Sequence, residues 1–185
     1  MSFNGKEITL INFLLAFYKN KIELFSDIIN QKTPLSLRLL DWLVTNYSKK
    51  YNITYPLKYN TDTIYFNVYI DYKNQLKAYS KKFFDPFCRQ KRLVIDPNTL
   101  KWKPYTSDDK LKEKDVVTTV GQLNFFRWFI ENKIMDYALG NVELIDSDMM
   151  ATVNSKKKGK RCVLSPSAVK GIYTNNCEIT IKFKP

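Results

Sequence analysis

One stretch near the middle of the sequence constrains the fold more than any other. It reads QLNFFRWFIENKIMDY over residues 122–137 and places large apolar side chains on nearly the whole circumference of a helix. Such a helix must be buried on more than one side, because exposing its apolar surface to water is unfavourable. Thr118 or Thr119 supplies the N-cap and Gly140 the stop. The sequence therefore predicts a central helix over residues 119–139.

The remaining periodicities predict an α+β fold, a single domain with about four helices packed on a small, mostly antiparallel sheet. Apolar residues spaced by three and four positions predict helices, and alternating apolar residues predict strands. The further helices are expected at residues 8–30, 34–48 and 72–83, the second with Thr33 as N-cap before Pro34. The strands are expected at residues 63–70, 91–96 and 178–184.

Connecting segments are marked by charge and by proline. Residues 97–117 contain two prolines and many charged side chains, and residues 154–162 contain a lysine run, so both are expected to be loops. Between these loops, residues 141–150 fit either a strand or a capped turn. We expect one domain over residues 1–185, with residues 1–33 either part of its core or a helical extension.

No arrangement of residues in the chain is typical of a catalytic or cofactor site. Histidine is absent, which removes the commonest general base and neutral metal ligand. The five glycines form no phosphate-binding loop, and the three cysteines contain no close pair for zinc or for a disulfide framework. The sequence therefore predicts a protein that is not an enzyme and that has no catalytic residue, cofactor or metal.

Two local arrangements keep an enzymatic alternative open. Asp146 and Asp148 could hold a divalent cation together with Glu143, as in a metal-dependent nuclease, although an exposed acidic turn is the simpler interpretation. Cys88 lies beside Arg89, and a neighbouring cation lowers the pKa of a thiol. Without a histidine partner, we expect Cys88 to be a packed apolar residue.

The chain is strongly basic, with 30 Lys and Arg against 18 Asp and Glu and a net charge of +12. The surplus is concentrated in residues 31–95, with twelve cations and four anions, and in residues 149–185, with eight and one. Cations neutralise phosphates and neighbouring aromatic rings stack on bases, so we expect a nucleic-acid-binding protein that is largely independent of sequence. The residues expected to bind are Lys49, Lys50, Lys81, Lys82, Arg89, Lys91, Arg92, Lys156, Lys157, Lys158, Lys160 and Arg161.

The last five of these cations form the run KKKGKR at residues 156–161. This composition is typical of a nuclear-import signal or a nucleic-acid patch. Gly159 disfavours a rigid helix, so we expect a flexible loop that binds phosphate without reading bases. The alternative for this run, and for the other lysines, is a merely solvated surface.

Membrane insertion is not expected. The apolar stretch ITLINFLLAFY at residues 8–18 is too short to span a bilayer, and no cleavage site follows it. The unpaired pattern of cysteines favours an intracellular protein.

Several stretches resemble an uncharacterised family of small basic proteins from nucleocytoplasmic large DNA viruses. They are LRLLDWLVTNYSKKYN at 37–52, YKNQLKAYSKKFFDPFCR at 72–89 and TTVGQLNFFRWFIENKIMDY at 118–137. Residues 159–183 are similar to the ending of that family, with a basic run, a Leu-Ser-x-Ser-Ala element and a final alternating strand. The resemblance covers most of the chain after residue 36 and implies a viral setting, but it implies no activity.

A viral setting suggests a second class of function. A virion structural or assembly protein would act through protein contacts, and the aromatic content of 15% supplies apolar surface for them. The expected partners are therefore DNA or RNA, or else viral structural proteins. The expected location is the host cytoplasm at a viral factory, the nucleus or the virion.

Overall fold

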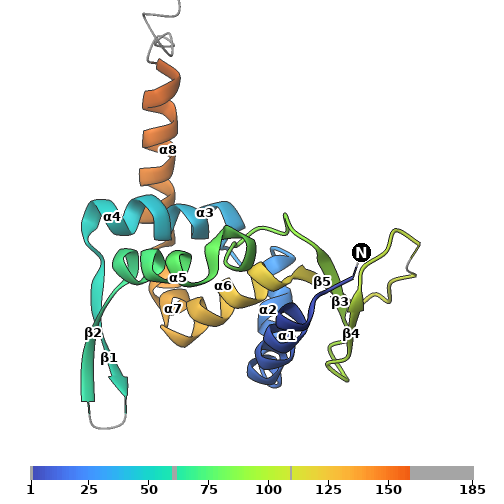
Figure 1. Cartoon of the computed structure of the whole chain (residues 1–185). Coiled ribbons are helices and arrows are strands. Elements are labelled where there is room, and N and C mark those ends of the chain that lie inside the picture. The colour runs from blue at the N-terminus through green and yellow to red at the C-terminus, as the bar shows by residue number, and fades with distance from the viewer. Residues whose placement is uncertain (1, 60–61, 109, 159–185) are drawn as a thin grey trace, which may run out of the picture. The chain divides into compact units, whose positions relative to one another are not determined.

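The computed structural model describes residues 2–59, 62–108 and 110–158. The chain divides into two compact units, residues 1–150 and residues 151–185. In the first unit, helices combine with two small antiparallel sheets, which confirms the expected α+β class (Figure 1). The described helices are more numerous than the four expected, because three of the predicted helices are divided into shorter ones and a further helix begins at Val142.

The helix expected at residues 8–30 is in fact two helices, α1 (Gly5–Tyr18) and α2 (Ile22–Ile29). Asn4 starts α1, since its side chain accepts the N–H of Glu7 at 2.8 Å and its own N–H is accepted by the Glu7 carboxylate at 2.9 Å. A single helix over 8–30 would be about 34 Å long, as long as a small domain is wide. The break lets both helices contribute to one core, with buried side chains at Ile11, Leu14, Leu15, Tyr18, Ile22, Phe25 and Ile28.

The helix expected at residues 34–48 is also divided. Its parts are α3 (Leu37–Trp42), a π-helical turn η1 (Leu43–Tyr47) and α4 (Ser48–Tyr51). Ser36 is the N-cap, and its hydroxyl accepts the N–H of Leu39 at 3.1 Å, so the prediction of Thr33 as the cap was wrong. Leu35 is fully buried, and Ser36 has an extended backbone with φ −72° and ψ 149°, so the helix begins only after Ser36.

A two-stranded antiparallel sheet follows, formed by β1 (Thr54–Tyr59) and β2 (Asp62–Asn67). The strand expected at 63–70 ends at Asn67, because the Asn67 side chain caps the next helix by accepting the N–H of Ile70 at 3.0 Å. That helix is α5 (Val68–Phe83), which therefore begins before the expected range of 72–83. The backbone of α5 leaves helical geometry at Ser80, where φ is 56° and ψ is 169°.

The second sheet has the strand order β4-β3-β5 and is antiparallel throughout. Its strands are β3 (Arg92–Ile95), β4 (Trp102–Pro104) and β5 (Val116–Thr119). The strand expected at 91–96 is confirmed, but β4 and the start of β5 lie in the region 97–117 that was expected to be a loop. These strands are three and four residues long, and β4 contains a proline, so alternation could not reveal them.

The expected single sheet was also wrong. The predicted strands at 63–70 and 91–96 correspond to β2 and β3, which belong to different sheets. The third predicted strand, at 178–184, lies outside the described residues. The first sheet pairs two consecutive strands, whereas in the second β3 lies between β4 and β5, so the chain crosses from one edge of that sheet to the other between β4 and β5.

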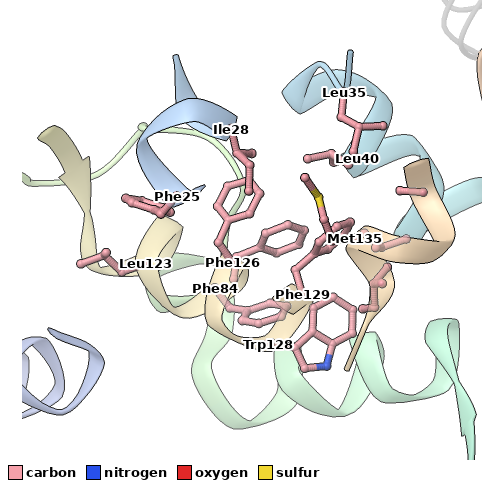
Figure 2. Close-up of a cluster of buried hydrophobic side chains, with 14 of the residues drawn as sticks. Phe25, Ile28, Leu35, Leu40, Phe84, Leu123, Phe126, Trp128, Phe129 and Met135 are labelled. Atoms are coloured by element: carbon pink, nitrogen blue, oxygen red, sulfur yellow. The ribbon is translucent and has the colours of Figure 1, made fainter. Parts of the chain in front are cut away.

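The central helix expected at residues 119–139 is confirmed as a buried helix, α6 (Val120–Glu131), but it ends earlier than expected. The rest of the range forms a separate helix, α7 (Ile134–Gly140), because the backbone is left-handed at Lys133, whose φ is 55°. Thr119 is the N-cap of α6, and its hydroxyl accepts the N–H of Gln122 at 3.1 Å. Helix α6 packs against α1 and α5 and is buried over most of its length. Figure 2 shows Phe126, Trp128 and Phe129 of α6 in one apolar cluster with side chains from other segments, including Phe25, Ile28, Leu35, Leu40, Phe84 and Met135.

The last described element is helix α8 (Val142–Lys158). It occupies residues for which a strand or capped turn, and then a loop at 154–162, were expected. The strand or turn was wrong, and so was the loop over residues 154–158, because no proline or glycine interrupts residues 141–158, and Ile145 and Met149 are buried four positions apart on one helical face. Residues 159–162 of the predicted loop lie outside the described residues.

Candidate nucleic-acid interface

The twelve cations expected to bind nucleic acid are distributed over both units of the chain. Seven of them, from Lys49 to Arg92, lie in the first unit. Lys156, Lys157 and Lys158 end helix α8, and Lys160 and Arg161 lie outside the described residues. For the seven cations of the first unit, the structure shows which carboxylates lie near them.

Lys82 and Lys91 converge on one buried carboxylate, Glu7. The Nζ atoms lie 3.3 Å and 3.5 Å from the Glu7 oxygens, and the Glu7 side chain is 2% exposed. The backbone N–H of Asn4 lowers the pKa of Glu7, and the two lysines lower it further. Both ammonium groups therefore serve first as counterions that permit the burial of Glu7.

Arg89 is held in the same way by Asp85. The Nε atom of Arg89 donates to Asp85 Oδ2 at 3.0 Å, and the Nη2 atom donates to Asp85 Oδ1 at 2.5 Å. The Asp85 side chain is 6% exposed. This bidentate contact raises the pKa of Arg89. Burial, and then the negative charge of Asp85, raise the pKa of nearby Asp41, while the positive charge of Arg89 lowers it. Arg89 therefore lies near two carboxylates, Asp85 and Asp41.

Lys50 pairs with Asp148 of α8. The same carboxylate accepts the indole N–H of Trp42 at 3.0 Å and the hydroxyl of Tyr51 at 3.1 Å. The ion pair with Lys50 is the main reason that the pKa of Asp148 is lowered and that of Lys50 is raised. Asp148 is therefore occupied by donors from α3 and α4, which hold the part of α8 that belongs to the first unit. Within the described residues, no group of three His, Cys, Asp or Glu side chains could hold a metal ion.

The other three of the seven predicted cations in the first unit are Lys49, Lys81 and Arg92. All three are exposed, and none of them is paired with a carboxylate in the described part of the chain. The Nζ of Lys49 lies 5.7 Å from the centre of the Tyr69 ring. Arg92 lies against Cys88, but burial of that thiol is the larger influence and raises its pKa, so the thiol is not activated.

The seven cations are thus divided among separate places, and four of them share three buried carboxylates, Glu7, Asp85 and Asp148. The spacing of basic residues along the chain could not show this, because Glu7 is 75 or more positions away from Lys82 and Lys91 and Asp148 is 98 positions from Lys50. Only the positions of these residues in the folded structure identify the ion pairs.

A basic groove that the sequence analysis missed lies on the sheet of β3 and β4. It has a volume of about 310 Å³, and its lining includes Lys101, Lys103, Lys110, Lys112 and Trp102. The region around these lysines is slightly acidic overall, so net charge did not indicate a site there. The alternation of lysine with tryptophan in KWK at 101–103 is the signal that could have done so.

None of the helices in the described part of the chain combines the length and the apolar character needed to cross a bilayer.

The chain belongs to a family of unknown function, DUF7197, whose profile matches residues 1–179. It is similar to the uncharacterized protein L507 of Acanthamoeba polyphaga mimivirus, with 39% identity over 165 residues. The match covers 86% of this chain and 60% of the relative, so the chain spans less than two thirds of that protein. No solved structure matches the chain. The expected resemblance to an uncharacterised giant-virus family is confirmed.

Proposed function

We propose that the protein binds nucleic acid without catalysis, largely independently of sequence, and that residues 156–161 supply most of the affinity. The observation that carries this proposal is the distribution of unbalanced charge. Residues 151–185 contain eight cations and one anion, whereas residues 1–150 contain 22 cations and 17 anions. The C-terminal segment therefore holds more than half of the net charge in about a fifth of the chain.

The ion pairs of the first unit increase the difference in available positive charge between the two units. Lys50, Lys82, Arg89 and Lys91 balance buried carboxylates, so they have less charge to offer to a phosphate. The run Lys156 to Arg161 has only Glu178 as an anion in its own unit. Lysine is a point charge that neutralises phosphate without reading base edges, so this segment supports affinity and not sequence recognition. DNA and RNA, at a viral factory, in the nucleus or in the virion, all fit this chemistry.

The test is a titration of the full chain with a labelled single strand and a labelled duplex at several salt concentrations. If five phosphates are neutralised, the logarithmic salt slope is about −4.5 for duplex DNA and about −3.5 for a single strand. Replacing Lys156, Lys157, Lys158, Lys160 and Arg161 by Gln is expected to remove most of this slope.

A matched control removes the same amount of charge elsewhere. Lys19, Lys58, Lys73, Lys77 and Lys133 are exposed and lie outside the ion pairs described above. Their replacement by Gln is expected to leave most of the binding intact. Equal losses in the two variants would show that only net charge matters, and binding that does not respond to salt would refute the proposal.

A virion structural or assembly role is the second candidate, and one observation favours it. Three large apolar side chains are exposed within seven residues: Ile64 at 54%, Tyr65 at 76% and Ile70 at 60%. Ile64 and Tyr65 are successive residues of β2 and face opposite sides of the hairpin, and large exposed apolar side chains of this kind can take part in protein contacts. This role predicts that purified particles contain the protein in a fixed copy number, which quantitative mass spectrometry of particles measures. Its absence from particles would eliminate this candidate.

A further inference from the structure

Strands β1 and β2 form a hairpin with a free edge on each side, because their sheet contains only these two strands among the described residues (Figure 1). Opposite residues of an antiparallel pair alternate between those that exchange hydrogen bonds and those whose N–H and C=O point outward. The N–H of Val68 donates to the carbonyl oxygen of Ile53 at 3.1 Å, where the register continues past the pair Thr54–Asn67. Every second pair from there is hydrogen-bonded, and the pairs between them point their backbone groups toward the free edges.

The free edge of β1 is protected against a further strand. Its outward positions include Pro56 and Lys58. Proline has no N–H to donate, and proline and lysine on an edge strand both disfavour pairing with another chain. We therefore expect no strand to add beside β1.

The free edge of β2 has no such protection, since neither proline nor lysine occurs between Asp62 and Asn67. Its outward positions include Thr63 and Tyr65, and in the described part of the chain their backbone groups have no hydrogen-bond partner. The side chains are open as well, with Tyr65 76% exposed and Ile64 54% exposed. An open edge of this kind is a template for another strand.

We propose that β2 pairs with β2 of a second copy of this chain, antiparallel and around a two-fold axis at Ile64, so that two hairpins form one four-stranded sheet. Outward backbone groups can meet only outward groups, which limits the register. With the axis at Ile64, Thr63 lies opposite the partner's Tyr65, and both residues exchange their N–H···O bonds. An axis at Tyr65 would instead bring the partner's turn against the start of α5 at Val68.

The strand is chemically complementary to its own copy in this register. Ile64 packs against the partner's Ile64, which covers a side chain that is exposed in the single copy. On the other face Tyr65 lies beside the partner's Thr63, and aromatic and β-branched residues form favourable cross-strand pairs. Asp62, the one charged residue of β2, lies opposite the partner's Phe66, so no like charges are opposed.

The interface is small and the two copies repel each other. A strand of six residues buries less than the total of about 1,000 Å² that a stable interface needs, so we expect a transient dimer. Each copy carries a net charge of +12, and salt screens the repulsion between them. Dimerisation should therefore strengthen with added salt, whereas nucleic-acid binding weakens. The proposed pairing goes beyond the proposed function and does not depend on it.

Sedimentation equilibrium of the full chain without nucleic acid, at low and high salt, measures the association. Ile64→Lys and Ile64→Glu each place like charges opposite each other and are expected to weaken the dimer by about tenfold or more. An equal mixture of these two variants is expected to restore association, because a cation then faces an anion across the axis. The matched control is the same pair of changes at Leu144 on α8, which is 61% exposed, and each control variant should dimerise like the unchanged chain.

Hydrogen exchange followed by NMR locates the contact on the strand. The amide protons of Thr63 and Tyr65 are expected to exchange more slowly as the protein concentration rises. The amide of Lys58, which points outward from the opposite edge, is the internal control and should keep its rate. Thr63→Pro removes an outward N–H without using one of the bonds to β1, and is expected to abolish the dimer.

The outcomes separate self-pairing from nucleic-acid binding. A chain that is still monomeric at about 1 mM, where even weak interfaces are populated, overturns the proposal and leaves the proposed function untouched. The open edge would then be left to a strand from a different protein. Dimers that persist equally in both Ile64 variants, or that protect neither Thr63 nor Tyr65, would place the contact elsewhere and also overturn it.

Discussion

Two groups of lysines in the first unit have the same charge but different surroundings. Lys82 and Lys91 lie against Glu7, a carboxylate with a 2% exposed side chain, whereas Lys101 and Lys110 line an open groove. In the first group, removing a cation leaves a buried negative charge without compensation. In the second group, removing a cation leaves only a more neutral surface. A basic residue therefore contributes to folding or to binding according to which carboxylate lies near it.

The largest effect is expected for Arg89→Met, which leaves the carboxylate of Asp85 buried without its bidentate partner. Breaking a fully buried pair costs more, but Arg89 is 61% exposed and water can partly replace it, so we expect a loss of about 2 kcal/mol in the free energy of unfolding. Urea denaturation measures this loss. An unchanged midpoint would show that Asp85 does not need its cation, which would break the comparison.

The double variant Lys82→Met with Lys91→Met tests the same idea at Glu7. Glu7 keeps the N–H of Asn4 but loses both ammonium groups, each partly exposed, so a loss of about 1.5 kcal/mol is expected. Glu7→Gln combined with the double variant should recover part of this loss, because no buried charge remains. Lack of recovery would mean that the lysines act by packing and not by charge.

Acid provides a smaller test of the same carboxylate. The pKa of Glu7 in the folded protein is below its ordinary value of 4.5, because the N–H of Asn4 and then the two lysines favour the ionised form. Its contribution to stability is present above pH 4.5 and is lost as the pH falls through the lower folded pKa. Glu7→Gln is expected to flatten the loss of stability over that acidic range, measured by thermal unfolding at a series of pH values. A curve parallel to that of the unchanged protein would contradict the expectation.

The smallest effect on folding is expected in the groove. Replacing Lys101 and Lys110 by Gln should change the free energy of unfolding by less than about 0.5 kcal/mol, since exposed substitutions away from buried partners seldom cost more. The same urea titration measures it. A loss as large as that of Arg89→Met would show that the groove lysines also support the fold, and the two groups would no longer differ.

Parts of the fold were predictable where a local pattern was strong. The central helix follows from apolar residues on all sides between Leu123 and Phe129, and its cap at Thr119 follows from side-chain chemistry. The helix breaks near residues 19–21 and 43–47 were not predictable, since the apolar periodicity continues across them. Strands β1, β4 and β5 were missed because they are stabilised by pairing with neighbours, and short segments show little alternation of their own.

The candidate site was also predictable only in part. The basic blocks could be located from the sequence, but their ion pairs could not, because Coulomb attraction depends on distance in space and leaves no period in the chain. Glu7 illustrates this limit, since nothing around it in the sequence indicates that Lys82 and Lys91 will reach it. The groove was missed for the same reason: its lysines lie in a segment whose average charge is slightly negative.

Sequence alone determined that one helix must be buried all round and that cations outnumber anions, because side-chain hydrophobicity and charge belong to each residue wherever it lies. Only the tertiary structure decided which of those cations face a buried carboxylate and which line an open surface. The physical reason is that the energy of a charge depends on its distance from other charges and on its access to water, and folding sets both.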